Sequence, residues 1–195
     1  AAITSLLCLG VVNPFASGIG GGGFAIVHWR EDRPSPTTEV IDFRSVAGSK
    51  ASEDMFVGHP ESSVHGGMSV AVPGEIQGMW DLHQQYGTLP WHELVMPAAL
   101  LARTGWRATL LLQKRIQQWE KDVLSSPTMK RLFAPGGRLL KEGDFFSRPA
   151  LAETLEKIAR EGASSFYQGV IAEKMLQDLE AAGGILTKED FGTYR

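Results

Sequence analysis

The residue best suited to binding a small anion is Arg44, in the segment Asp42-Phe43-Arg44. It follows the apolar residues of a predicted strand, and a guanidinium at the end of a strand can hold a planar fork in place for a carboxylate. The alternative is a surface ion pair between Arg44 and Asp42 or another nearby acid, and residue types and spacing alone favour that alternative. On its residues alone, Arg44 is therefore a candidate anion clamp for which a surface ion pair remains the favoured alternative.

No residue pattern in the chain predicts a catalytic nucleophile or a metal site. There is no Gly-x-Ser-x-Gly elbow and no Cys–His pairing with suggestive spacing. The five histidines lack a metal-ligand spacing such as His-x-x-x-His, and the single cysteine, Cys8, excludes an internal disulfide and a cysteine-based metal site. His83 falls on the apolar face of a predicted helix, where a hydrogen-bonded core histidine is favoured over a catalytic base. We therefore expect no catalytic residue, no metal and no cofactor in this chain.

The glycine-rich segment from Ser17 to Phe24 formally contains the dinucleotide fingerprint, as Gly18-x-Gly20-x-x-Gly23. A dinucleotide loop must follow a strand and open a helix, whereas here a helix precedes the glycines and a strand follows them. No Lys-Ser/Thr pair follows, so a phosphate-binding P-loop is excluded as well. We expect a structural turn near a site, with positive-φ geometry or a close approach of the backbone to another segment or a ligand.

Two apolar segments predict a β-hairpin. Residues 24–29 are expected to form a mostly buried strand and residues 39–44 a second one, joined by the polar, proline-marked turn 30–36. Residues 69–72 predict a short third strand. Before the hairpin, residues 2–10 have helical spacing.

The rest of the chain has the apolar spacing of helices. Pro73 is expected in the first turn of a helix that ends at Gly87. Pro97 is expected to end one helix and to begin another that Gly105 ends. Further apolar stripes are formed by Leu112, Ile116, Trp119 and Val123, by Leu151, Leu155 and Ile158, and by Ile171, Met175 and Leu179. Thr187-x-x-Asp190 predicts a capping box. Because strands come first and helices second, the order predicts the α+β class.

Composition is typical of a globular protein, with 43% apolar and 21% charged residues in a chain of 195 residues. This length suffices for one domain or for part of a larger one. The net charge of −3 conceals a basic middle, since residues 103–141 carry nine basic and two acidic side chains. Stacking aromatics are not spaced among these charges, so we expect a solvated face and no nucleic-acid partner.

An ordered set of short segments resembles the large subunit of the γ-glutamyltransferases. Its most distinctive block is Val11-Val12-Asn13-Pro14 leading into the glycine-rich segment, and it continues through Ile41-Asp42-Phe43-Arg44. The remaining blocks are Val70-Ala71-Val72-Pro73-Gly74-Glu75, Tyr86-Gly87, Leu89-Pro90-Trp91, Pro97-Ala98, Leu101-Ala102-Arg103, Phe166-Tyr167-x-Gly169, Gly183-Gly184-x-Leu186-Thr187, Asp190 and Tyr194. The resemblance thus extends over essentially the whole chain.

This resemblance implies part of a four-layer αββα sandwich of the N-terminal-nucleophile hydrolase type, incomplete in this chain. It identifies residues 1–195 as a partial large-subunit region, one incomplete domain truncated at both ends. It also implies a precursor that cleaves itself, with the nucleophilic threonine at the new N-terminus of a small subunit that pairs with this chain. The implied substrates are glutathione and related γ-glutamyl donors, with water, amino acids or peptides as acceptors. A location in the secretory pathway is implied as well.

Arg44 matches the family arginine that holds the α-carboxylate of the donor. The family usually reads Arg-Glu-x-Ala-Pro after this strand, whereas this chain has Arg44-Ser45-Val46-Ala47-Gly48. The difference removes a charge and a backbone restraint beside the clamp. Two alternatives therefore stay open: a related amide acylase of the same superfamily, and a catalytically inactive homologue with a binding or structural role.

Overall fold

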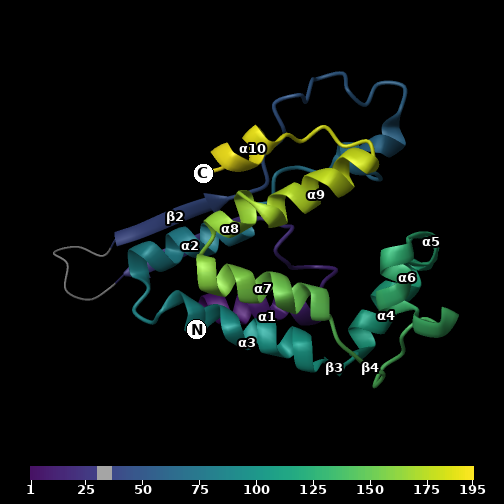
Figure 1. The fold of residues 1–195 in the computed structure, drawn as a ribbon, viewed down its shortest axis with the longest axis horizontal. Helices are drawn as coiled ribbons and strands as arrows, with labels where there is room; N and C mark the ends of the chain where they lie inside the picture. The colour runs from purple at the N-terminus through teal and green to yellow at the C-terminus, as the bar shows by residue number, and fades with distance from the viewer. Residues whose placement is uncertain (30–36) are drawn as a thin grey trace. The chain divides into compact units, whose positions relative to one another are not determined.

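The computed structural model describes residues 1–29 and 37–195, and the predicted turn at 30–36 lies outside these described residues. The chain forms two compact units, one made of residues 1–18 and 92–159, the other of residues 19–91 and 160–195. Helices and strands occur in both units (Figure 1), so the predicted α+β class is confirmed.

The first unit is almost entirely helical. Its elements are α1 (Ala2–Val12), α3 (Trp91–Thr104, which enters this unit at His92), β3 (Trp106–Arg107), α4 (Leu110–Gln118), α5 (Glu120–Ser125), α6 (Pro127–Phe133), the 3₁₀ turn η3 (Pro135–Gly137), β4 (Phe145–Phe146) and most of α7 (Pro149–Glu161). Strands β3 and β4 pair antiparallel and carry Trp106 and Phe146, whose rings lie 4.3 Å apart between centroids. Buried side chains of α4, α5 and α6 pack against them, so the short strands close a helical core.

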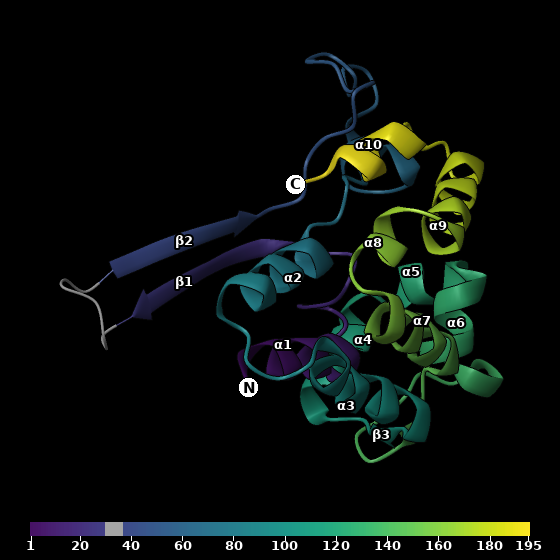
Figure 2. The same cartoon turned by 60° about the vertical axis from the view of Figure 1, so that its left-hand side comes forward.

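The second unit holds a β-hairpin and the helices that pack on it. Its elements are β1 (Gly23–Trp29), β2 (Thr37–Phe43), the 3₁₀ turns η1 (Pro60–Ser63) and η2 (Gly67–Ser69), α2 (Glu75–Tyr86), α8 (Ser164–Tyr167), α9 (Val170–Ala181) and α10 (Lys188–Thr193). The strands are antiparallel, with Gly23 opposite Phe43 and Ile26 opposite Val40. Helix α2 runs along one face of the hairpin (Figure 2) and contacts both strands.

The prediction that β1 is mostly buried is wrong. Phe24 is 60% exposed and Ile26 73% exposed, and Val40, opposite Ile26, is 63% exposed. Side chains of a strand alternate between two faces, so α2 covers only one of them. The continuous apolar run of 24–29 is typical of a strand buried on both faces, which misled the prediction.

The predicted third strand at residues 69–72 is also wrong. Only Val72 pairs, through an isolated antiparallel bridge to Val46. The amides of Val70 and Gly74, which would extend the ladder on either side, donate to Gly67 and Gly21 instead. Pro73 precedes α2, which begins at Glu75, so it does not lie in the first turn. The predicted helix end at Gly87 is confirmed.

Helix α3 continues through Pro97, contrary to the predicted break. The proline removes the hydrogen bond to the carbonyl of Glu93, yet both residues lie on the exposed side, where water can satisfy that carbonyl. Buried residues on the opposite side, from Leu94 to Ala102, hold the helix in place. The predicted end at Gly105 is confirmed, with φ of +81°.

The stripe predicted after residue 110 is confirmed for Leu112, Ile116 and Val123, which are buried, and wrong for Trp119, which is 47% exposed. Trp119 has φ of −109° and ψ of 28°, so the helix breaks there into α4 and α5. Among the described residues, no helix has the length and apolar character needed to cross a bilayer.

Candidate functional site

Arg44 lies directly after β2, at a strand end fixed by its neighbour Phe43. The Phe43 side chain is 6% exposed and fills the space beside Gly78 of α2, where an added Cβ would lie 2.2 Å from the ring. It also lies against Gly23, its partner across the hairpin. Close packing on two glycines therefore sets where the strand ends and where Arg44 begins.

Both backbone polar groups of Arg44 are held by side chains. Its N–H donates to Asp42 Oδ1 at 2.9 Å, and its carbonyl accepts from Tyr194 Oη at 2.8 Å. Asp42 thus binds the backbone of Arg44. No ion pair of the Arg44 guanidinium occurs among the described residues; its Cζ lies 5.9 Å from the centroid of the exposed Phe24 ring. The guanidinium is exposed and the backbone that carries it is fixed, an arrangement that suits an anion clamp better than a surface ion pair.

The glycine-rich segment lies against this strand end, so the predicted close backbone approach is confirmed. A Cβ on Gly22 would lie 2.5 Å from the carbonyl oxygen of Phe43 and 2.8 Å from the amide nitrogen of Ser45. The carbonyl of Gly21 accepts from the amides of Gly74, at 2.8 Å, and Glu75, at 3.0 Å. The segment therefore binds the first amides of α2 as well as bordering Arg44. These close contacts explain the glycine at residue 22.

Two tyrosines that sequence reasoning did not single out as site residues hold the same region. Tyr194 stacks on Tyr167, with ring centroids 5.6 Å apart and an interplanar angle of 4°. Tyr167 Oη donates to the carbonyl of Pro73 at 2.8 Å and accepts from the amide of Gln77 at 3.1 Å. Burial raises the pKa of the Tyr167 hydroxyl, which keeps it protonated as a donor. Both tyrosines belong to the family blocks, but their contacts across about 100 residues leave no local signal.

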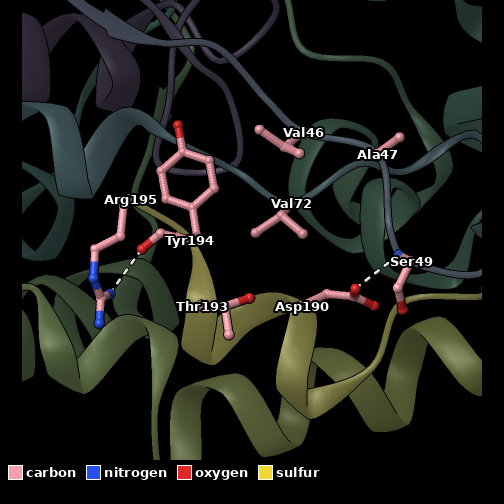
Figure 3. Close-up of a pocket in the computed structure, with 8 residues that line it drawn as sticks. All are labelled: Val46, Ala47, Ser49, Val72, Asp190, Thr193, Tyr194 and Arg195. Carbon is pink, nitrogen blue, oxygen red and sulfur yellow. Dashed lines mark hydrogen bonds between the residues drawn. The ribbon is translucent and has the colours of Figure 1, made fainter.

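A pocket of about 360 Å³ lies between the segment that follows β2 and helix α10 (Figure 3). Its lining comes from the segment after β2, from Val72, and from the end of α10 with the residues after it: Val46, Ala47, Ser49, Val72, Asp190, Thr193, Tyr194 and Arg195. The hydroxyl of Thr193 donates to the carbonyl of Glu189 at 2.8 Å. The lining contains no histidine or cysteine, and its one carboxylate, Asp190, has a pKa lowered to about 2, so it is too weak a base to activate a neighbouring hydroxyl group.

Asp190 connects the pocket wall to the Arg44 segment. Its Oδ1 accepts from the amide of Ser49 at 2.7 Å, and its Oδ2 accepts from the amide and hydroxyl of Thr187 at 2.8 and 2.7 Å. The predicted capping box is thereby confirmed. Desolvation disfavours the charged carboxylate, but these hydrogen bonds outweigh it and lower the pKa of Asp190 to about 2. The carboxylate is therefore ionised, and both of its oxygens already accept hydrogen bonds, which suits a structural role.

The histidines and Cys8 show no catalytic arrangement. His83 bonds the carbonyl of Leu89 at 2.8 Å and packs against the rings of Trp80 and Trp91. The predicted hydrogen bond is confirmed, but the residue is only half-buried and does not lie in the core. Desolvation raises the pKa of the Cys8 thiol, which disfavours the reactive thiolate. In the part of the chain that the structure describes, no group of His, Cys, Asp and Glu side chains could hold a metal ion.

The sequence matches a family model described as Gamma-glutamyltranspeptidase over residues 1–195. "Scoloptoxin SSD14" of Scolopendra dehaani is 44% identical over 100% of this chain and 34% of the relative. "Glutathione hydrolase proenzyme 1" of Schizosaccharomyces pombe is 44% identical over 100% of this chain and 30% of the relative. The crystal structure of Helicobacter pylori gamma-glutamyltranspeptidase superposes with a TM-score of 0.93 and 34% identity, over 100% of this chain and 56% of that one.

The family match, the identity over the full chain and the superposition agree with one another. The chain spans about a third of the length of these curated relatives. Arg44, the glycine-rich segment and the capping box all lie within the matched range. On this evidence, the chain belongs to the γ-glutamyltranspeptidase family.

Proposed function

We propose that this chain is part of the large subunit of a γ-glutamyl transferase or hydrolase that cleaves the γ-glutamyl amide of glutathione and related compounds. The nucleophilic threonine lies on a segment outside this chain, at the N-terminus of a small subunit released from the same precursor. Residues 1–195 form one part of a single domain, a four-layer αββα sandwich completed by that subunit. The family match and the glutathione hydrolases among the relatives support this proposal. By the same resemblance, the protein enters the secretory pathway.

The chemistry of acyl transfer explains why the small subunit supplies the nucleophile and this chain binds the donor. A threonine hydroxyl is a weak nucleophile, and the α-amine of the same residue can accept its proton as the oxygen attacks the γ-carbonyl carbon. The amide nitrogen then leaves with a proton, and the γ-glutamyl ester passes to water or to the amine of an amino acid or peptide. None of these steps needs a nucleophile from residues 1–195. What this chain must supply is a grip on the donor that places its γ-carbonyl at the threonine.

Arg44 supplies that grip by binding the α-carboxylate of the donor. One observation carries the assignment: the exposed guanidinium of Arg44 projects from a backbone held at both polar groups, while Asp42 is occupied by the Arg44 amide. A planar guanidinium can bind a carboxylate through two parallel hydrogen bonds. The donor's α-carboxylate is the group of γ-glutamyl compounds that fits this fork.

The test uses the full-length, self-cleaved protein and a chromogenic γ-glutamyl anilide. Arg44→Ala should raise the donor KM by about 10-fold to 150-fold, because a hydrogen bond to a charged group contributes about 1.5–3 kcal/mol. Arg44→Lys should lose less, since it keeps the charge and loses the bidentate geometry. Arg160, an exposed arginine of α7 in the same unit, gives the matched control Arg160→Ala. An unchanged donor KM in Arg44→Ala would overturn the assignment.

Residue 45 is a serine, where the family usually has an acid. This difference supports one alternative, an amide acylase of the same superfamily that acts on a different acyl donor. The same preparation distinguishes it, because an acylase would release amine from a non-glutamyl acyl amide faster than from the γ-glutamyl anilide. A catalytically inactive homologue would show neither activity and no threonine in the context of a cleavage site.

A further inference from the structure

We propose that Tyr194 is a positioning residue for donor binding, because its hydroxyl fixes the carbonyl of Arg44 and so aims the guanidinium at the donor's α-carboxylate. This inference rests on the proposed function. Tyr194 does not touch the donor in this account. It acts only through the backbone of Arg44.

The hydrogen bond from Tyr194 completes the restraint on Arg44. Asp42 already holds the Arg44 amide at 2.9 Å, so the bond from Tyr194 Oη at 2.8 Å fixes the peptide group on the other side of the same Cα. With both neighbouring peptide planes held, the direction of the Cα–Cβ bond is set. An arginine side chain loses much rotamer entropy when it is ordered, so a fixed position of its Cα–Cβ bond favours a defined guanidinium position.

Gly74 leaves the space that the Tyr194 hydroxyl occupies. A Cβ on Gly74 would lie 2.1 Å from Tyr194 Oη and 2.0 Å from the carbonyl oxygen of Phe43, so only glycine allows the approach. The glycine of the Val-Pro-Gly-Glu block thus has a steric explanation that involves Tyr194 directly.

Tyr194 is itself rigid. Its ring is 6% exposed and stacks on Tyr167, which is bonded to Pro73 and Gln77. Burial raises the pKa of the Tyr194 hydroxyl, so it stays a protonated donor at neutral pH. The preceding helix α10 is fixed by its capping box and by the bond from Ser49 to Asp190. Because the ring and the preceding helix are held in place, the Tyr194 hydroxyl can fix the position of the Arg44 carbonyl.

The first experiment measures binding without turnover, on the full-length, self-cleaved protein by calorimetry. L-Glutamate carries the α-carboxylate, and 4-aminobutyrate has the same amine and distal carboxylate without it. Tyr194→Phe removes only the hydroxyl and should weaken L-glutamate binding by about threefold to tenfold, the range for one neutral hydrogen bond. Binding of 4-aminobutyrate should not change. Tyr86→Phe is the matched control, because it removes a hydroxyl that bonds Glu39 in the same unit.

A double-variant cycle separates positioning from general loss of structure. In the Arg44→Ala background, Tyr194→Phe should have no further effect on L-glutamate binding, because the group that it aims is gone. With a γ-glutamyl anilide, Tyr194→Phe should raise KM and leave kcat within about twofold, as expected when only binding of the donor is altered.

Each outcome separates the two claims. If the wild-type protein neither cleaves the γ-glutamyl anilide nor binds L-glutamate, the proposed function fails and the inference fails with it. If Arg44→Ala weakens L-glutamate binding and Tyr194→Phe does not, only the inference is overturned. Equal weakening of both ligands by Tyr194→Phe, or the same loss in the Arg44→Ala background, would show a structural role and overturn it too.

Discussion

Gly78, near the start of α2, packs directly against Phe43 at the end of β2. A Cβ at this position would lie 2.2 Å from Cγ, 2.4 Å from Cβ and 2.5 Å from Cδ1 of Phe43. Carbon atoms in favourable contact lie about 3.5–4.0 Å apart, so an alanine at 78 must displace the Phe43 ring by more than about 1 Å. Gly78→Ala therefore tests whether α2 and β2 pack as closely as the structure shows.

Two opposing effects decide the sign of this substitution. Alanine in place of glycine in a helix interior gains about 1 kcal/mol of helix propensity. Overpacking a buried site costs about 1–3 kcal/mol, and the size of the required displacement places this case in the upper half of that range. We expect a net destabilisation of about 1–2 kcal/mol and a lower thermal unfolding midpoint of the full-length protein.

The matched control is Gly192→Ala in α10. Nothing lies within 4 Å of the added Cβ there, so this variant keeps the propensity gain without the collision and should unfold at the same or a higher temperature. Phe43→Leu should cost less in the Gly78→Ala background than in the wild type, because the smaller side chain relieves the overlap. A midpoint for Gly78→Ala at or above that of the wild type would refute the close approach of α2 to Phe43.

Two further predictions concern side chains that bind backbone groups. Because the pKa of folded Asp190, about 2, lies below its ordinary value of 3.8, its contribution to stability is complete above a pH of about 4 and is lost as the pH falls toward 2. Asp190→Asn should therefore flatten the fall of the unfolding midpoint in that window, and an unaltered pH profile would contradict the role of its bonds to Ser49 and Thr187. Arg148 donates to the carbonyls of Gly10 and Val11 at 3.2 and 3.4 Å, at the end of α1. Arg148→Met should lower the free energy of unfolding by about 1.5 kcal/mol, the low end for a hydrogen bond from a charged group, because both distances are long. Arg148→Lys keeps the charge near the end of α1 and should lower it less. Equal unfolding midpoints for the two Arg148 variants would contradict a stabilising role of the positive charge.

Local chemistry explains which parts of the fold the sequence could predict. Thr187 and Asp190 form a capping box with partners three residues apart, so the whole interaction lies in one short segment. Gly105 has φ of +81°, a conformation that glycine adopts without strain at helix ends. In each case the decisive contact or dihedral belongs to residues close together in the sequence.

The predictions that were wrong, or that the sequence could not make, concern features set by tertiary packing. The apolar run 24–29 could not reveal that α2 covers only one face of the hairpin, because that depends on where a later helix packs. Pro97 could not reveal that the buried face of α3 holds the helix together across it. The contact from Tyr194 to Arg44 spans 150 residues and involves a backbone carbonyl, which no residue type encodes. Arg44 itself was identified through the family blocks.

The two departures from the family pattern after Arg44 also have a physical reading in the fold. Without the proline at residue 48, the segment loses one backbone restraint, but other contacts hold it. Val46 and Val72 exchange both backbone hydrogen bonds, at 2.8 and 3.2 Å, and the Ser49 amide binds Asp190 at 2.7 Å. A Cβ at Gly48 would lie 2.6 Å from Cδ2 of Leu186, so a larger residue there would have to displace the end of that leucine side chain. The position of Arg44 therefore does not depend on that proline. The missing acid at residue 45 is different, because no described contact of Ser45 supplies a charge in its place.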